Sequence, residues 1–198
     1  MEKLQTLILE NKPKINIDGR VCHHRIEILY ALTEIYILEN YLEIGVHNGS
    51  SISYVLQSNK NKNCIGIDPF ETLQTKDPCM THYIKNDNIT EQKTLQNISK
   101  NNHYNSNIKL IKKLSENVLN NEINDNIDLL FIDGDHNYKS VLNDYMKFSK
   151  YVKSGGFIVF DDLHQDGPKK CFKEIVDNKK DVKLFGIYKK TEGILRKL

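Results

Sequence analysis

The chain has 198 residues, of which 39% are hydrophobic and 27% are charged, as is typical of one soluble globular domain with a buried core. Its 28 basic and 26 acidic residues leave a net charge of only +2, which argues against nucleic-acid or membrane partners, because both select concentrated basic patches. No apolar run approaches the roughly 20 residues of a transmembrane helix.

The N-terminal residues lack the features of a signal peptide. The four cysteines are far apart and form no CxxC pair: Cys22, Cys64, Cys79 and Cys171. Neither a disulfide framework nor a zinc knuckle is indicated, and we expect a cytoplasmic protein in a reducing compartment.

The first 39 residues carry helical apolar spacing. We expect helices at 2–10 and about 22–39, separated by a break at Pro13 and Gly19. We expect residues 1–198 to form a single domain, in which this N-terminal segment helps to shape a substrate site.

From residue 41 onward, short apolar runs alternate with helical segments. The expected strands are 41–46, 63–68, 108–111, 127–133 and 157–162. The expected helices are 50–59, 89–101, 115–121, 138–151 and 168–179, and the last two segments, 182–190 and 192–198, should form an antiparallel pair. This alternation predicts an α/β fold with a mostly parallel sheet covered on both faces. The long irregular stretch 69–88 is typical of a binding segment or lid.

The segment 41–51 reads as a strand, a tight turn and a helix start. Gly45 allows the sharp turn and lets a ligand lie against bare backbone, while Gly49 and Ser50 should place free N–H groups at the helix N-terminus. A dinucleotide fold requires GxGxxG, whereas this chain has ExGxxxG with Glu43 before the first glycine. S-adenosylmethionine (SAM) has no phosphate, and its amino group and sulfonium favour nearby carboxylates. A helix-entry turn without a ligand would look similar.

Asp68 ends the second strand of the alternating pattern, 25 residues after Glu43. An acid at this point can accept both ribose hydroxyls of a nucleoside. The structural alternative is an Asp-Pro turn, since Pro69 follows. Asp68 therefore indicates a nucleoside and does not distinguish SAM from NAD.

Carboxylates follow two later strands, in IDGDHNY (132–138) and GGFIVFDDLH (155–164). In a parallel sheet these strand ends share an edge, and carboxylates gathered there repel one another unless a cation lies between them. Oxygen ligands favour Mg²⁺. We assign Asp135 to helix capping, and the same structural role is the alternative for Asp133, Asp161 and Asp162.

Two histidines lie in the same loops. His136 comes three residues after Asp133, within reach of a coordinated hydroxyl, and its ordinary pKa near neutrality suits a general base. His164 follows the second acid pair and is a candidate substrate contact. The alternative for both is a solvated loop histidine.

With these residues in view, the sequence resembles the class I SAM-dependent methyltransferases, which have a three-layer Rossmann-like fold. LEIGVHNGSS and IGIDPF resemble the first and second family motifs, and FIDGDHNY and SGGFIVFDD resemble the fourth and fifth. The resemblance covers about residues 40–165. It is nearest to methyltransferase domain family 24 and the macrocin-type metal-dependent sugar O-methyltransferases.

The resemblance implies roles for individual residues. Asp133, Asp161 and Asp162 match the ligands of a divalent cation, Mg²⁺ or Mn²⁺. Glu43, Gly45, Gly49, Ser50, Asp68, Ser115 and Asp133 match the cofactor site, with Ser115 near the adenine, although a helix N-cap is the alternative for Ser115. Catechol-type relatives place a catalytic lysine where this chain has His136, so the base departs from that pattern.

We therefore expect transfer of a methyl group from SAM to a sugar or glycan hydroxyl, with His136 and Asp133 as the catalytic residues. A small phenolic acceptor is the alternative substrate. An NAD-dependent oxidoreductase and a non-catalytic nucleotide-binding module are the alternatives from other classes. A homodimer is compatible with these expectations.

Overall fold

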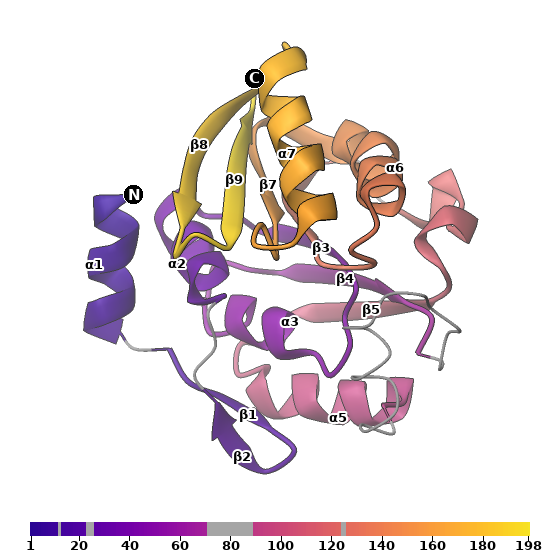
Figure 1. Cartoon of the computed structure of the whole chain (residues 1–198). Coiled ribbons are helices and arrows are strands. Elements are labelled where there is room, and N and C mark those ends of the chain that lie inside the picture. Colours follow the sequence, from indigo (N-terminus) through magenta and orange to yellow (C-terminus); the bar gives the residue numbers. More distant parts are fainter. Residues whose placement is uncertain (12, 23–25, 71–88, 124–125) are drawn as a thin grey trace.

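The computed structural model describes residues 1–11, 13–22, 26–70, 89–123 and 126–198, without the side chains of residues 20–22. Within these ranges lies a seven-stranded sheet in the order β5-β4-β3-β6-β7-β9-β8 (Figure 1). The strands are β3 (Asn40–Ile44), β4 (Asn63–Asp68), β5 (Asn107–Lys112), β6 (Ile127–Ile132), β7 (Val152–Phe160), β8 (Val182–Tyr188) and β9 (Glu192–Lys197).

Strands β3 to β7 pair with one another in parallel, whereas β9 runs antiparallel to both β7 and β8. The two C-terminal segments therefore form the antiparallel pair that the sequence predicts. The mostly parallel α/β fold of the prediction is confirmed.

Helices cover both faces of the sheet (Figure 1). One face packs against α1 (Glu2–Asn11), α2 (Glu27–Tyr36), α3 (Ser50–Val55) and α5 (Glu91–Asn101), and the other against α6 (Tyr138–Phe148) and α7 (Asp166–Asn178). Alternate residues of a strand point to opposite faces. In β6, Leu129 and Phe131 thus enter the first core, and Leu130 and Ile132 enter the second.

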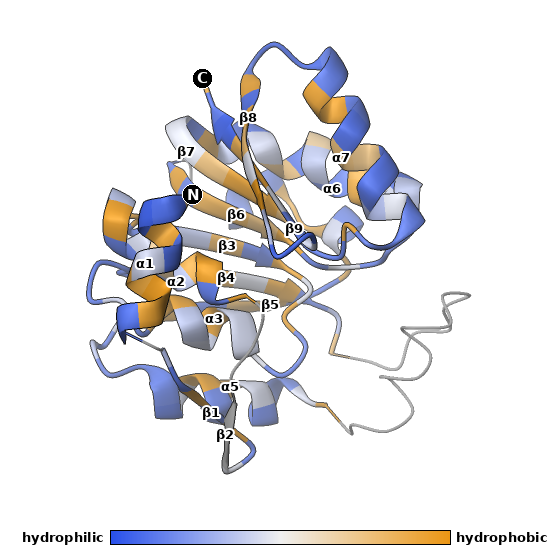
Figure 2. Ribbon diagram, turned by 60° about the vertical axis from the view of Figure 1, so that its left-hand side comes forward, coloured by the Kyte–Doolittle hydropathy of each residue, from blue (hydrophilic) through white to orange (hydrophobic). Residues whose placement is uncertain are grey.

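The middle strands β6 and β7 are strongly hydrophobic (Figure 2), and every residue of β6 is buried. Strands that are covered on both faces need such continuous apolar runs. In the described part of the chain, no helix is both long enough and apolar enough to span a bilayer.

The expected helix at about 22–39 is wrong at its beginning. A two-stranded antiparallel hairpin, β1 (Ile15–Ile17) and β2 (Arg20–Cys22), precedes the helix, which begins only at Glu27. Asp18 and Gly19 both have positive φ, 49° and 77°. Asp-Gly in this conformation is a strong hairpin signal, because its twist matches that of the flanking strands.

Two further boundaries differ from the prediction. Instead of a helix at 115–121 there are two 3₁₀ turns, η1 (Ser115–Asn117) and η2 (Asn120–Glu122). Strand β7 begins at Val152, before the two glycines, and its pairing with β6 shifts register between Ile127 and Leu129. Most of the stretch 69–88, namely 71–88, lies outside the described residues.

The edge of the sheet where the parallel strands begin is tied together by Asp128, a buried carboxylate on β6. Its Oδ2 accepts the N–H groups of Glu39 and Asn40 at 3.1 and 2.9 Å and the side-chain amide of Asn40 at 3.1 Å. Its Oδ1 contacts the ammonium of Lys153. Asp128 therefore joins the beginnings of β3, β6 and β7.

We expect Asp128→Ala to lower the free energy of unfolding by about 2–4 kcal/mol, since it leaves buried donors without their acceptor. Urea unfolding of the two proteins measures the change. Asp177→Ala, at an exposed position of α7, is the matched control and should stay within about 0.5 kcal/mol of wild type. Equal stability of the two variants would contradict this role.

Candidate functional site

The candidate site lies at the edge where the parallel strands end. Gly45, Pro69, Asp133 and Asp161 are the first residues after β3, β4, β6 and β7. Strand β3 has β4 on one side and β6 on the other. The strands that follow β3 in sequence are therefore added first on one side of it and then on the other. Open α/β sheets bind their ligands at such a switch point.

Gly45 holds two of these strand ends together. Its φ is +88°, and a Cβ at this position would lie 2.0 Å from the carbonyl oxygen of Asp133. Only glycine fits, because any side chain would collide with backbone. The turn after β3 is thereby pressed against the residue that begins the acidic loop after β6.

Asp68 holds the same turn from the other side. Its Oδ2 accepts the N–H groups of Val46 and His47 at 3.0 and 2.9 Å, and its Oδ1 accepts the N–H of Phe70 at 2.6 Å. His47 has a positive φ of 50°. Asp68 is thus both a turn-forming residue and an acid at the predicted nucleoside position.

Gly49, with a φ of +81°, is the N-cap of α3, and Ser50 is its first residue. The N–H of Gly49 donates to the carbonyl of Val46 at 2.9 Å, and that of Ser50 donates to Asn48 Oδ1 at 3.1 Å. The expectation that these N–H groups are free is therefore wrong. Neighbouring backbone and Asn48 already satisfy them.

A buried polar stripe on α5 supports this turn, and the sequence analysis missed it. Thr94 donates to the carbonyl of His47 at 2.6 Å. The side-chain amide of Asn97 donates to the carbonyl of Asn48 and to Asp18 Oδ1, both at 3.2 Å. The turn is thus linked to the β1–β2 hairpin. Polar residues at helical spacing where a core-facing stripe should be apolar are the signal that could have revealed it.

Glu43 is fully buried at the end of β3. Tyr41 donates its hydroxyl to Oε2 at 2.8 Å, and Ser51 donates to Oε1. Burial raises the pKa of Glu43 to about 8, an effect that these two hydrogen bonds only partly oppose. The side chain is therefore largely protonated at neutral pH, and it supports the turn from within the core. Its predicted contact with a cofactor stays a prediction.

Across the edge, the structure brings together Asp133, His136 and Asp162. One possible ligand atom from each lies within 4.8 Å of the other two. His136 Nε2 is 3.0 Å from Asp162 Oδ2, and both side chains are mostly buried. Asp162 has a positive φ of 55°, a conformation that aspartate tolerates better than most residues and that is often found at functional sites.

Asp161 and His164 flank this trio. Asp161 Oδ1 accepts the N–H of Asp162 at 2.7 Å. His164 Nδ1 lies 3.4 Å from Asp162 Oδ1, and half of its side chain is exposed. The predicted metal ligands are Asp133, Asp161 and Asp162. Among the described residues, the group whose geometry could hold a metal contains Asp133, Asp162 and His136, and it does not include Asp161.

Two assignments concern the neighbouring turns. Asp135 accepts the N–H of Asn137 at 3.2 Å and the hydroxyl of Ser140 at 2.7 Å. The N-cap of α6 is Asn137, so the helix-capping assignment of Asp135 is wrong, and Asp135 supports the turn before the helix. Ser115 is the first residue of η1, whose N-cap is Leu114, so the N-cap alternative for Ser115 is wrong.

A buried acid from the C-terminal strand also lies at this edge. Gly193 pairs with Phe160, the last residue of β7, so Glu192 is placed beside the acid pair. Glu192 is fully buried, and the N–H of Leu163 donates to the carbonyl of Thr191 at 2.8 Å. The sequence analysis missed this residue, because nothing in TEGILRKL shows which strand end it accompanies.

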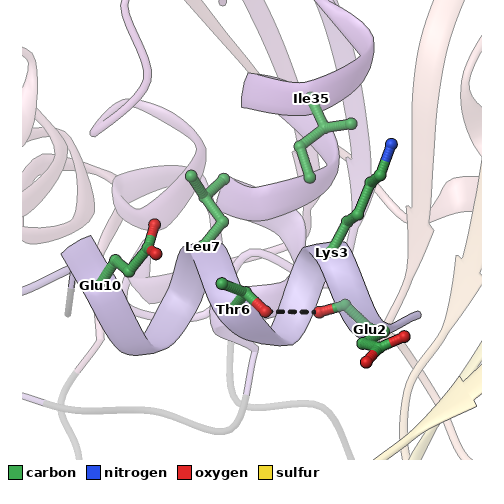
Figure 3. Close-up of a pocket in the computed structure, with 6 residues that line it drawn as sticks. All are labelled: Glu2, Lys3, Thr6, Leu7, Glu10 and Ile35. Atoms are coloured by element: carbon green, nitrogen blue, oxygen red, sulfur yellow. Dashed lines mark hydrogen bonds between the residues drawn. The ribbon is translucent and has the colours of Figure 1, made fainter.

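A shallow hollow of about 330 Å³ lies between α1 and α2, away from these residues (Figure 3). Its lining consists of Glu2, Lys3, Thr6, Leu7, Glu10 and Ile35. None of these is a predicted site residue, and the chemistry belongs to the strand ends.

The pKa of Glu43 predicts a pH effect on stability. Between pH 4.5 and about 8 the folded chain holds a proton on Glu43 that the unfolded chain has lost, so stability falls as pH rises, by at most about 1.4 kcal/mol per pH unit. The amide of Glu43→Gln does not titrate, so the variant lacks this pH dependence. In urea unfolding at pH 5 and pH 8, the variant should gain stability relative to wild type as pH rises. A difference that is constant with pH would contradict the raised pKa.

Comparison with known proteins agrees with this geometry. A curated protein of Acanthamoeba polyphaga mimivirus, the uncharacterized protein R132, is 37% identical over 159 residues, which are 77% of this chain and 65% of that protein. The chain thus spans less than two thirds of this relative's length.

Solved structures share the fold. The O-methyltransferase NovP has a TM-score of 0.68 at 14% identity, over 87% of this chain and 77% of its own. An O-methyltransferase from Bacillus cereus has a TM-score of 0.61 at 18% identity, over 99% of this chain and 89% of its own. CalS11, described as a TDP-rhamnose 3'-O-methyltransferase, has a TM-score of 0.55 at 15% identity, over 86% of this chain and 76% of its own.

A family model described as a methyltransferase domain matches residues 42–163. The match runs from the third residue of β3 to the turn after β7 and so includes the strand ends described above. Since it covers more than half of the chain, the chain belongs to this methyltransferase domain family, methyltransferase family 24, as its resemblance to the class I methyltransferases predicts.

Proposed function

We propose that the chain is a SAM-dependent O-methyltransferase that uses a divalent cation and acts on a sugar or glycan hydroxyl. The observation that carries the proposal is the grouping of Asp133, His136 and Asp162 beside the turn formed by Gly45 and Asp68. A cofactor position and an acid-base group are thereby neighbours at one sheet edge.

Membership of the methyltransferase family favours SAM over NAD. The similar O-methyltransferase from Bacillus cereus was solved in complex with S-adenosylhomocysteine (SAH), and another, TomG, in complex with SAM. Asp68 at the end of β4 would accept the ribose hydroxyls. The methyl group would then face β6 and β7, where the acids and His136 lie.

The transfer needs an acceptor oxygen in line with the methyl carbon and the sulfur. A lone pair of the acceptor oxygen forms the new C–O bond, and the electrons of the broken C–S bond stay on sulfur, giving SAH and a methyl ether. The hydroxyl proton passes to His136. Asp162, 3.0 Å from Nε2, orients the imidazole and stabilises its charged form, as acids do in other catalytic pairs.

The residues present fit a divalent cation. Carboxylate oxygens are the ligands that Mg²⁺ and Mn²⁺ prefer, whereas imidazole favours other transition metals. We therefore assign the cation to Asp133, Asp162 and the adjacent Asp161, and keep His136 as the base. A bound cation would acidify the acceptor hydroxyl and fix its position.

Two observations support a sugar hydroxyl as the methyl acceptor. CalS11, a similar fold, is described as acting on TDP-rhamnose. His164, half exposed beside Asp162, can donate or accept a hydrogen bond to a sugar hydroxyl at the rim of the site.

The cofactor proposal is tested at Asp68. Asp68→Ala should weaken SAH binding by about 1.5–3 kcal/mol in titration calorimetry, the usual loss for a charge-assisted hydrogen bond. The variant should also melt at a lower temperature, because Asp68 holds three backbone N–H groups.

Asn97→Ala is the matched control for this second effect. It removes a support of the same turn and is not a predicted cofactor contact, so it should weaken SAH binding much less. Equal losses in the two variants would mean that Asp68 acts only on the turn.

The base and the cation are tested together. His136→Ala should lower turnover by about 10²–10⁴-fold, with the affinity for SAH and the half-saturating Mn²⁺ concentration nearly unchanged. Turnover is measured with radiolabelled SAM against a panel of nucleotide-linked deoxysugars, at several Mn²⁺ concentrations. The exposed His103→Ala is the matched control and should behave as wild type.

Other outcomes reassign the residues. If saturating Mn²⁺ restores His136→Ala, His136 is a cation ligand and another group is the base. If wild type keeps full activity in excess EDTA, the cation is excluded and the acids bind substrate directly.

A further inference from the structure

Gly167 is a residue of α7 that the proposed reaction does not use. It is the second residue of the helix, after the N-cap Gln165 and Asp166, and its φ is not positive. Nothing in the local backbone therefore requires glycine, and glycine weakens a helix relative to alanine. The reason for a glycine at this position is a tertiary contact.

That contact is with the His136 loop, residues 133–137, which joins β6 to α6. A Cβ at Gly167 would lie 2.0 Å from the carbonyl oxygen of His136 and 2.8 Å from the backbone nitrogen of Tyr138. Real Cβ atoms essentially never come within 3.0 Å of such an atom. An alanine would therefore have to move the two backbones apart by about 1 Å.

Two further residues of α7 contact the same place. The ammonium of Lys170 lies 4.7 Å from the ring centroid of Tyr138, and the hydroxyl of Tyr138 donates to Glu174 Oε2 at 2.5 Å. Residues 167, 170 and 174 have the i, i+3, i+7 spacing of one helical face. Helices α6 and α7 lie side by side (Figure 1), so this face of α7 packs against the beginning of α6 and the loop before it.

The helix is the fixed partner in this contact. The N–H of Asp161 donates to the carbonyl of Ile132 at 3.1 Å, which ties the segment before α7 to the sheet. The residues of the His136 loop are only partly buried or exposed. A clash at Gly167 is therefore relieved by displacement of the His136 loop. The side chains that anchor α7 in the core are Pro168, Cys171, Phe172 and Ile175.

We infer that Gly167 is a positioning residue for His136, a role that rests on the proposed function. The segment 162–167 meets His136 twice. Asp162 Oδ2 lies 3.0 Å from its Nε2, and Gly167 abuts its main-chain carbonyl. The size of residue 167 therefore sets the distance between the imidazole and Asp162. A displacement of about 1 Å can lower a reaction rate by about 10²-fold, even when it arises away from the reacting atoms.

Gly167→Ala should lower turnover by about 10²-fold, measured with radiolabelled SAM and the same panel of nucleotide-linked deoxysugars. Its affinity for SAH should stay nearly unchanged, because the turn at Gly45 and Asp68 is not touched. In a His136→Ala background, Gly167→Ala should cause no further loss, because it acts only through His136. A general structural defect would lower turnover in both backgrounds.

Gly156→Ala is the matched control. Gly156 is a buried residue of β7 without a positive φ, and a Cβ there would lie 2.9 Å from the carbonyl oxygens of Asp128 and Lys153. The change thus also forces a methyl group against backbone, but at the edge where the strands begin. It should be destabilised and yet keep wild-type turnover once folded.

A second readout does not depend on turnover. The ring signals of His136 in a ¹H–¹⁵N NMR spectrum, identified by their loss in His136→Ala, report the contact with Asp162. At one fixed pH these signals should move in Gly167→Ala and stay in place in Gly156→Ala. Unchanged signals in Gly167→Ala would overturn the inference.

A variant without added volume serves where Gly167→Ala does not fold. Lys170→Ala combined with Tyr138→Phe loosens the same contact between α7 and the His136 loop. Turnover should then fall by about fivefold, the effect of about one lost hydrogen bond, with SAH affinity unchanged. Wild-type turnover in this double variant would contradict the positioning role.

Two further results would overturn the inference: wild-type turnover in a folded Gly167→Ala, or an equal loss in Gly167→Ala and Gly156→Ala. Failure of the proposed function would look different. In that case wild type would bind no SAH or transfer no methyl group to any acceptor. The NMR comparison would still decide whether Gly167 sets the position of His136, and only the role of that position in methyl transfer would fall.

Discussion

The site depends on one contact between two backbones. A Cβ at Gly45 would come within 2.0 Å of the carbonyl oxygen of Asp133, so the ends of β3 and β6 can meet only through glycine. This contact brings the turn held by Asp68 against the loop that carries Asp133 and His136. Without it, the proposed cofactor position and the proposed reacting groups would belong to separate surfaces.

The acids at this edge fall into two kinds, according to their surroundings. Glu43 and Asp144 are buried behind the surface, and burial raises the pKa of each, to about 8 and about 6. Asp133 and Asp162 are less buried and face His136. Charge is costly where water is excluded, unless a partner compensates it. Glu43 therefore supports the neighbouring Tyr41 and Ser51 from within the core, whereas the outer pair faces the space where chemistry is proposed.

The sequence predicted the parallel sheet well because the signals are local. Runs such as LLFI in β6 and FIVF in β7 are apolar because both sheet faces are covered, and glycines or acids follow directly. The hairpin at 15–22 was missed although Asp18-Gly19 is a local signal, since the helical apolar spacing was given more weight. The 3₁₀ turns after β5 were also missed, because one short helical turn resembles another in sequence.

For the site, the sequence by itself determined which residue types end each strand: Gly45, Asp68, Asp133, Asp161 and Asp162. The periodicity of the apolar residues and the order of the strands suffice for this, because parallel strands end at a common edge. Only the tertiary structure decided the partners. Asp162 faces His136, Asn97 supports the turn at Asn48, and Lys147 holds the carbonyl of Ser115. Each of these contacts joins residues at least 26 positions apart, and no local pattern encodes the packing of helices and loops that brings them together.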